Sequence, residues 1–259
     1  RAEKRRQDGS LLENTLNKLE VTGKWRKAPD PGNYGDTDES AQFSIALELC
    51  ITWLNRILFL KLLEGQLRRW SDVQAASAAE DAAGTFLKAD FIKDFDDLHE
   101  LFFEVLNRPW EQRRVAVQER YGALPYLNSS LFETTTLEDA TFSVEALNDR
   151  ADMALAPNTV LRDTAGQRRT GRMNTLHYLF AFLDAYDFSS VSKARIQADN
   201  RDVINAAVLG LIFEKINGYR DGSFYTPGFI TMYMCRETLR RAVLQKFNER
   251  YGWNCADLD

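Results

Sequence analysis

The sequence has 259 residues, 44% of them hydrophobic and 12% aromatic, which is enough to bury a substantial core in one or two domains. The formal net charge is −5, which argues against a protein that lies on DNA over its whole surface, because phosphate contacts require lysine and arginine. The cysteines are too far apart in sequence to indicate a zinc site or a disulfide framework. We therefore expect buried thiols in a reducing, cytoplasmic environment, at Cys50, Cys235 and Cys255.

The N-terminal part of the sequence predicts a short helix, a loop and a long helix. Leucines recur at helical spacing within the first twenty-odd residues, at Leu11, Leu12, Leu16 and Leu19. Residues 24–36 are rich in proline and glycine and predict the loop. Residues 40–70 are apolar almost all round and predict a long helix at the centre of the core. Glu48, Arg56 and Lys61 interrupt its most apolar stretch, so we predict no contact with a membrane.

The middle of the sequence predicts two further helices that follow a small, polar connector at residues 75–84. The first helix is predicted over residues 91–106 and the second over residues 110–121. Aromatic residues form a stripe on the first, at Phe91, Phe95, Phe102 and Phe103. Such stripes are more typical of a protein core than of a surface on which bases stack.

A small β hairpin excursion is predicted around residues 141–172 of this otherwise mainly α sequence. Phe142–Val144 and Thr159–Leu161 are strand-like, and Asp163–Gly166 has the composition of a hairpin turn. Arginines gather in this region, at Arg162, Arg168, Arg169 and Arg172. A second group lies near the C-terminus, at Arg236, Arg240 and Arg241. Each group is either a phosphate-binding patch or a solvated face that nearby carboxylates balance.

The C-terminal part predicts helices over residues 174–186, capped by Asn174 or Thr175, and over residues 199–217. A last helix is predicted from Pro227 towards residue 250, with Thr226 as its N-cap. Apolar residues of this helix share one side, at Phe229, Met232, Leu239, Val243 and Phe247. Phe224 and Tyr225 would then lie in a short loop before a helix N-terminus, which suits a carboxylate or phosphate. The same two rings could instead form a hydrophobic staple.

Three segments resemble the type IIG restriction–modification enzymes, which fuse an endonuclease to a DNA adenine-N6 methyltransferase. The segment Gly222-Ser-Phe-Tyr-Thr-Pro227 resembles the G-x-F-Y-T-P motif that precedes the S-adenosylmethionine fold. Tyr126-Leu-Asn-Ser-Ser-Leu-Phe-Glu133 resembles their Y-L-N-G-G-L-F-E segment, and Arg56-Ile-Leu-Phe-Leu60 resembles their R-x-L-F-L helix. Ser129 and Ser130 stand where glycines are common, and serine does not adopt positive φ as glycine does, so the shape of this turn is open.

The resemblance implies that Phe224, Tyr225, Thr226 and Pro227 contact S-adenosylmethionine in the complete enzyme. It also implies double-stranded DNA as the partner, with phosphate contacts from Arg168, Arg169 and Arg172 as one possibility. The N-P-P-Y motif and the glycine-rich cofactor turn of such methyltransferases do not occur in this sequence. No acidic-x-Lys element occurs either, so we expect no Mg²⁺ site of the nuclease type and no catalysis by this segment alone. The two histidines, His99 and His177, are interpreted as structural.

The sequence is therefore predicted to be mainly α, a multi-helix connector bundle from such an enzyme. The predicted divisions are an N-terminal helical segment (1–28), a helical connector domain (37–217) and the start of the methyltransferase domain (218–259). The connector would hold nuclease and methyltransferase in a fixed relation. The alternative is a non-enzymatic helical module that binds a protein partner or the DNA backbone. A stand-alone methyltransferase of a type I system fits the long helical region less well.

Overall fold

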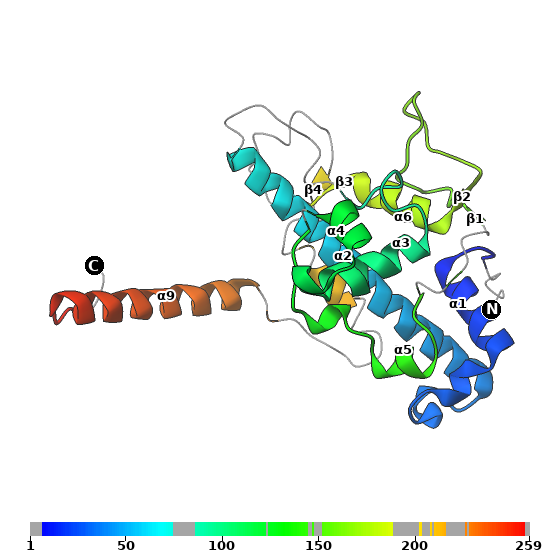
Figure 1. Cartoon of the computed structure of the whole chain (residues 1–259), viewed down its shortest axis with the longest axis horizontal. Helices are drawn as coiled ribbons and strands as arrows, with labels where there is room; N and C mark the ends of the chain where they lie inside the picture. Colours follow the sequence, from blue (N-terminus) through cyan, green and yellow to red (C-terminus); the bar gives the residue numbers. More distant parts are fainter. Residues whose placement is uncertain are drawn as a thin grey trace. The chain divides into compact units, whose positions relative to one another are not determined.

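The structure, a computed structural model, is mainly helical with a small two-stranded antiparallel sheet, as the sequence predicts (Figure 1). It describes residues 7–74, 86–122, 124–144, 147, 152–188, 202–203, 208, 210–215, 226 and 228–256. The chain divides into two compact units, Arg1–Ile204 (unit 1) and Asn205–Asp259 (unit 2). Each unit is described separately below.

Helix α1 of unit 1 spans Leu11–Thr22 and matches the prediction. The Ser10 hydroxyl accepts a hydrogen bond from the Glu13 amide (3.3 Å), which caps the first turn. Gly23 ends the helix in the left-handed region at φ 63°, where glycine carries no steric cost. The predicted loop that follows contains two short 3₁₀ helices, Lys24–Lys27 and Pro31–Tyr34.

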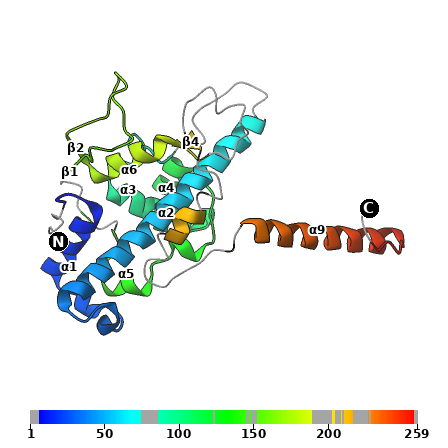
Figure 2. The same cartoon turned by 180° about the vertical axis from the view of Figure 1, so that it is seen from behind.

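Helix α2 spans Asp38–Gln74, which confirms the predicted long helix, and it is the main helix of unit 1. In Figure 2, α2 runs diagonally across the front of unit 1, and α3, α4 and α6 lie behind it; Figure 1 shows the same elements from the opposite direction. Its core residues are almost completely buried, at Ile45, Ala46, Leu49, Trp53, Ile57 and Leu60. Within the part of the chain that the structure describes, Asp38–Gly65 is long and apolar enough to cross a membrane, but 50% of its most apolar stretch is buried in the protein. We assign this stretch to the core.

The two helices predicted after α2 are shorter than expected. Helix α3 begins at Phe95, not at residue 91, and ends at His99 (Phe95–His99); a π-helix then continues over Glu100–Leu106. The later start has a local cause, because the Asp94 carboxylate accepts a hydrogen bond from the Asp97 amide (2.9 Å) and caps the helix there. The predicted aromatic core is confirmed by Phe95 and Phe102, which are buried.

The helix predicted over 110–121 is broken into a 3₁₀ helix, Trp110–Gln112, and helix α4, Val115–Tyr121. Arg113 lies between them with extended backbone angles (φ −77°, ψ 143°). Its buried guanidinium donates to the carbonyl oxygens of Arg108 (3.0 Å) and Leu124 (2.9 Å). These bonds hold the side chain inward at the break, an arrangement that helical periodicity does not reveal.

The remaining elements of unit 1 are short. A 3₁₀ helix, Ser130–Phe132, precedes helix α5, Thr136–Ala140. Strands β1, Asp152–Ala154, and β2, Arg172–Asn174, pair antiparallel, with Met153 opposite Met173. The predicted β excursion is thus confirmed, but the strands expected at Phe142–Val144 and Thr159–Leu161 are wrong, because neither segment belongs to a strand. Phe142, Val144 and Leu161 are instead buried in the core.

Helix α6, Thr175–Asp184, follows β2 directly, and Asn174 caps it as predicted. The Asn174 side-chain oxygen Oδ1 accepts hydrogen bonds from the amides of Leu176 (2.8 Å) and His177 (3.2 Å). Strand β3, Tyr186–Asp187, pairs in parallel with β4, Asp202–Val203. The helix predicted from residue 199 is therefore wrong at β4, where strand pairing takes up the backbone hydrogen bonds.

Unit 2 contains helical residues at 210–215 and helix α9, Gly228–Tyr251, which confirms the predicted last helix within one residue at its start. None of the residues of α9 is buried. Cys235 and Cys255 are exposed, so the expectation of buried thiols is wrong for both, whereas Cys50 is buried as predicted. At the end of the helix the rings of Tyr251 and Trp253 stack at 5.0 Å between centroids.

Candidate functional site

Two of the segments that resemble restriction–modification enzymes meet inside unit 1. Residues 56–60 lie on α2, and residues 126–133 form the turn and 3₁₀ helix before α5. The Phe59 and Phe132 rings contact edge to face, with 5.9 Å between their centroids. Phe132 is completely buried and also contacts Phe102 (5.7 Å). The two segments are therefore one structural feature, although they are far apart in sequence.

Arg56 holds this junction together. Its side chain is completely buried and donates through Nε to the Leu131 carbonyl oxygen and through Nη2 to the Glu133 carbonyl oxygen, both at 2.8 Å. The same guanidinium forms a bidentate pair with the Glu138 carboxylate, at 2.5 and 2.8 Å. A buried charge is tolerated only when it is paired and hydrogen-bonded in this way.

Glu138 has a second role as part of the cap of α5. The Glu138 amide donates to the Thr135 hydroxyl (3.2 Å), and the Thr135 amide donates to the Glu138 carboxylate (2.8 Å). This reciprocal arrangement is a capping box. One carboxylate therefore fixes the start of α5 and neutralises Arg56 on α2.

In the turn at residues 126–133, where Ser129 and Ser130 stand in place of the glycines of the similar enzymes, the left-handed backbone conformation falls on a neighbouring residue. Asn128 adopts the positive φ of 42°. Ser129 is extended (φ −127°, ψ 129°) and its hydroxyl accepts from the Leu131 amide (3.3 Å). Tyr126 donates its hydroxyl to the Asn128 side-chain oxygen (2.8 Å), and asparagine tolerates this backbone region better than most residues. The serines therefore fit the turn without left-handed backbone angles.

A second buried ion network ties α2 to α6. Lys61 Nζ lies 2.6 Å from both Glu64 Oε2 and Asp184 Oδ1. The other Glu64 oxygen accepts from the amides of Phe86 (2.8 Å) and Leu87 (2.9 Å). Arg56 and Lys61, two of the polar residues that interrupt the apolar stretch of α2, thus position the elements that pack against it.

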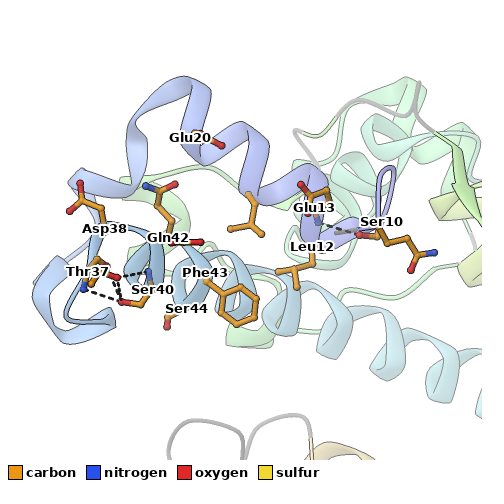
Figure 3. A pocket seen from close by; sticks show the side chains of 13 residues that line it. Ser10, Leu12, Glu13, Glu20, Thr37, Asp38, Ser40, Gln42, Phe43 and Ser44 are labelled. Atoms are coloured by element: carbon orange, nitrogen blue, oxygen red, sulfur yellow. Dashed lines mark hydrogen bonds between the residues drawn. The ribbon is translucent and has the colours of Figure 1, made fainter. Parts of the chain in front are cut away.

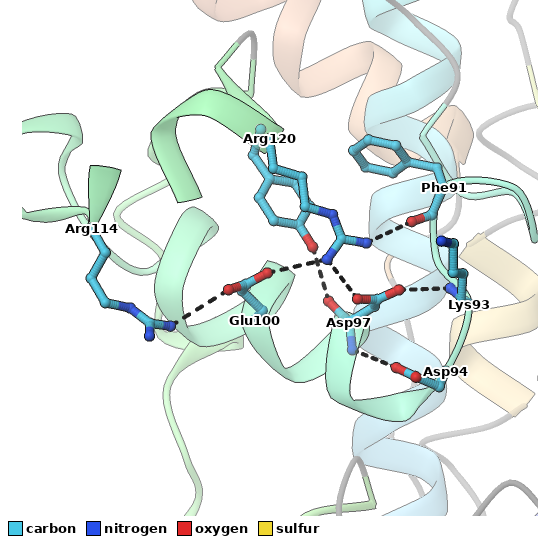
Figure 4. A network of polar contacts seen from close by, with 8 residues as sticks. Phe91, Lys93, Asp94, Asp97, Glu100, Arg114 and Arg120 are labelled. Atoms are coloured by element: carbon cyan, nitrogen blue, oxygen red, sulfur yellow. Dashed lines mark hydrogen bonds and ion pairs between the residues drawn. The ribbon is translucent and has the colours of Figure 1, made fainter. Parts of the chain in front are cut away.

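A third polar network lies on the outer side of α3 and α4 (Figure 4). The Arg120 Nη1 donates to Asp97 Oδ1 (2.6 Å) and to Glu100 Oε2 (3.3 Å), while its Nη2 donates to the Phe91 carbonyl oxygen (2.9 Å). The hydrogen bond from Arg120 lowers the pKa of Asp97, although partial burial opposes this shift. Burial raises the pKa of Tyr121, whose hydroxyl donates to the Asp97 carbonyl oxygen (3.4 Å). This network attaches α4 to the start of α3.

A groove of about 910 Å³ lies between α1 and the start of α2 (Figure 3). Leu12, Leu16 and Phe43 provide its apolar surface. Among the residues that the structure describes, the lining also includes carboxylates and no cation, with the acidic residues at Glu13, Glu20, Asp38 and Glu39. These carboxylates repel phosphate.

The arginines of the hairpin are exposed, and the backbone brings two of them face to face. Arg162 and Arg168 are antiparallel bridge partners. Arg169 is also exposed. Arg172, on β2, donates to the Asp152 carbonyl oxygen across the sheet. The predicted turn at 163–166 is confirmed: Gly166 has φ 77° and its amide donates to the Asp163 carbonyl oxygen (3.0 Å).

Of the residues predicted to contact S-adenosylmethionine, only Thr226 is within the described structure. It is exposed and has no regular secondary structure, two residues before α9 begins at Gly228. Phe224, Tyr225 and Pro227 lie outside the described residues. A hydroxyl close to a helix N-terminus suits the carboxylate of a methionine group, so Thr226 fits the expected cofactor at this position.

Sequence reasoning did not identify Glu138, Asp97 or Glu64 as partners of buried or half-buried cations. The pattern Thr135-x-x-Glu138 is a readable capping-box signal that could have identified Glu138. Asp97 and Glu64 pair with groups that are distant in sequence, and no local sequence pattern indicates these pairings. Among the residues that the structure describes, no group of three His, Cys, Asp or Glu side chains could hold a metal ion.

The chain is similar to one named protein and to one protein family. Over 249 residues the chain is 24% identical to a protein of Methanocaldococcus jannaschii named "Putative type II restriction enzyme and methyltransferase RM.MjaORFECS2P". The match covers 88% of this chain and 17% of that protein, so the chain corresponds to a small part of the relative's length. No solved structure matches the chain. Residues 1–204, which coincide with unit 1, match a family described as a domain of unknown function, DUF7814, and the chain belongs to this family.

Proposed function

We propose that this chain is the helical connector of a restriction–modification enzyme of the type IIG class and leads into its adenine-N6 DNA methyltransferase. The observation that carries the proposal is the junction at Arg56. Two segments that resemble this class form one buried structure there. The similarity of 88% of the chain to a protein named as a restriction enzyme and methyltransferase supports the same assignment.

The mechanical role proposed for the connector is to keep nuclease and methyltransferase at a set separation. Helix α2 has 37 residues, which corresponds to a length of about 55 Å at 1.5 Å per residue. Arg56 joins it to α5 and Lys61 joins it to α6, both through buried or half-buried ion pairs. Both attachments lie near the middle of α2, about 8 Å apart along its axis, and they fix the position and rotation of the helix relative to α5 and α6. A helix held in this way can keep its two ends at a set distance.

The complete enzyme would use S-adenosylmethionine, which supplies an electrophilic methyl group for adenine N6. Phe224, Tyr225, Thr226 and Pro227 would contact this cofactor, with the Thr226 hydroxyl near its methionine end. A nuclease part would require Mg²⁺, and unmodified double-stranded DNA would be cleaved in the cytoplasm. We propose no catalytic residue within this chain.

The test uses the protein encoded by the complete reading frame and measures binding of S-adenosylmethionine by calorimetry and methyl transfer to DNA. We expect Tyr225→Ala and Thr226→Ala each to weaken cofactor binding by about tenfold, the equivalent of one hydrogen bond or ring stacking interaction. Tyr233→Ala is the matched control, because Tyr233 is exposed on α9 outside the motif. Wild-type cofactor affinity in both motif variants would reduce the motif to a helix cap, and no methylation by the wild-type protein would overturn the proposal.

A further inference from the structure

We propose that residues 152–174, called the arginine arm below, bind the phosphate backbone of double-stranded DNA through Arg162, Arg168 and Arg169. The arm consists of β1, β2 and the segment that joins them, which projects from the body of unit 1 in both views (Figures 1 and 2). The choice of DNA as the partner rests on the proposed function, whereas the anion-binding character of the arm follows from its own geometry.

The arm carries a positive formal charge, whereas the chain as a whole is negatively charged. It contains four arginines and two aspartates and no lysine or glutamate, so its formal charge is +2 in a chain of net charge −5. The Asp163 carboxylate is occupied at the tip, where Oδ1 accepts from the amides of Ala165 and Gln167, both at 2.9 Å. In the part of the chain that the structure describes, no carboxylate lies within ion-pair distance of Arg162, Arg168 or Arg169.

The backbone places two of these charges directly opposite each other. The Asp163 amide donates to the Gln167 carbonyl oxygen (2.8 Å) and the Arg169 amide donates to the Leu161 carbonyl oxygen (3.0 Å). These bonds flank the Arg162–Arg168 pair, which is therefore a non-hydrogen-bonded pair of the ladder. Side chains in such pairs have Cβ atoms about 4.5–5.5 Å apart, and like charges there destabilise the hairpin. An anion between the two guanidinium groups removes this repulsion.

The root of the arm is fixed, so the arginines are presented on a supported structure. Gln7 Nε2 donates to the Ala154 carbonyl oxygen (2.8 Å), and the Thr175 hydroxyl donates to the Gly9 carbonyl oxygen. A Cβ atom at Gly9 would lie 2.5 Å from the Asp152 carbonyl oxygen, so only glycine allows this close approach. Within the arm itself, Leu161 is buried and anchors the chain beside Arg162.

Arg172 differs from the other three arginines in its position on β2 at the root of the arm. Arg168 also donates to a backbone carbonyl oxygen, that of Pro157, but through Nη1 alone and at 3.4 Å. The Arg172 guanidinium donates to the Asp152 carbonyl oxygen and joins β2 to β1. We therefore assign phosphate contact to Arg162, Arg168 and Arg169, and a positioning role at the root of the arm to Arg172. Phosphate contacts of this kind orient a protein on the duplex without reading base sequence.

The test measures binding of the full 259-residue chain to a fluorescein-labelled duplex by anisotropy over a series of sodium chloride concentrations. The key variant replaces Arg162, Arg168 and Arg169 by glutamine. Each phosphate that an arginine neutralises contributes about −0.9 to the slope of log K against log salt, so we expect the slope to decrease in magnitude by about 0.9 for each arginine that bound a phosphate. The triple lysine variant keeps the charges and is expected to keep the slope.

The matched control replaces Lys24, Arg26 and Lys27 by glutamine, which removes the same charge from a second basic segment of unit 1. We expect its salt slope to equal that of the wild type. A control whose slope falls as much as that of the arm variant, an arm variant with the wild-type slope, or a wild-type chain that does not bind duplex at low salt would each overturn the proposal. Because methylation is measured separately in the complete enzyme, failure of one proposal leaves the other standing.

Discussion

Arg56 on α2 and Glu138 on α5 form a bidentate ion pair with O–N distances of 2.5 and 2.8 Å, and both side chains are completely or almost completely buried. They are separated by 82 positions in sequence. The same two side chains also satisfy backbone groups, through the bonds from Arg56 to Leu131 and Glu133 and from the Thr135 amide to Glu138. Removal of either charge therefore leaves several buried groups without a partner.

We expect Arg56→Met to lower the free energy of unfolding by about 3–5 kcal/mol, the usual result when one partner of a buried ion pair is removed. Urea denaturation followed by circular dichroism measures this change. The control is Arg26→Met, because Arg26 and Asp38 are exposed and 3.9 Å apart, and loss of such a pair costs about 0–1 kcal/mol. Equal losses in the two variants would show that the junction is not the main attachment of α5 to α2.

Asn128 should be replaceable by glycine but not by alanine. We expect Asn128→Ala to lower the free energy of unfolding by about 1–2 kcal/mol, since alanine resists the left-handed backbone. Glycine accepts this φ without strain and should cost less than alanine. Tyr126→Phe removes the hydrogen bond to Asn128 alone and isolates that contribution. An alanine variant as stable as the glycine variant would mean that the backbone angle is not constrained in solution.

The stability contributed by Asp97 should depend on pH. Because Arg120 lowers the pKa of Asp97 in the folded protein, the carboxylate stabilises the fold above its unfolded pKa of about 3.9, and this contribution is lost as pH falls through the lower folded pKa. We expect Asp97→Asn to cost about 1 kcal/mol at neutral pH and progressively less below about pH 4. Thermal unfolding over a pH series measures the difference.

The control for this experiment is Asp96→Asn, because Asp96 lies in the same first turn of α3 and is exposed. That variant removes a charge at the same helix end but keeps the ion pair between Asp97 and Arg120. A loss of stability at Asp97 that does not change with pH would contradict the assigned role of its charge.

The cysteines should differ sharply in reactivity. Burial raises the pKa of Cys50 to about 11, and its Sγ lies 3.4 Å from the Thr15 hydroxyl. We therefore expect Cys235 and Cys255, both exposed, to react with a disulfide reagent at mildly alkaline pH, while Cys50 reacts only after unfolding. Mass spectrometry of the labelled protein identifies the modified residues. Labelling of Cys50 at the rate of Cys235 would contradict the buried position of this part of α2.

Local sequence signals predicted the elements whose ends are set by neighbouring residues. Asn174 was predicted as a cap and does cap α6 with its own side chain. The ends of α1 are also set locally, by the Ser10 side chain and by the left-handed backbone of Gly23, but neither residue was named from the sequence. The length of α2 followed from its continuous apolar composition. Elements whose form depends on distant partners were predicted less well. The break at Arg113 depends on a carbonyl group beyond α4, and β4 exists only because β3 lies beside it.

In the candidate site, too, local features could be predicted from the sequence, whereas contacts between distant segments could not. The sequence identified Arg56 and the segment 126–133 as members of separate motifs, but their contact became visible only in the structure. Likewise, the arginines of the arm were visible as a cluster, whereas the opposition of Arg162 and Arg168 depends on hairpin register. A register shift by one residue would place these side chains on opposite faces, so composition alone could not predict the pair.

The two attachments of α2 also define its helical phase. Arg56 faces Glu138 of α5 and Lys61 faces Asp184 of α6, so the rotation between these positions must be preserved. One inserted residue between them would turn the rest of the helix by about 100° and move it by about 1.5 Å. At least one ion pair would then be broken. An insertion of four residues would nearly restore the rotation, to about 400°, but would separate the two positions by about 6 Å more. We therefore expect any insertion or deletion between Arg56 and Lys61 to break one of the two ion pairs.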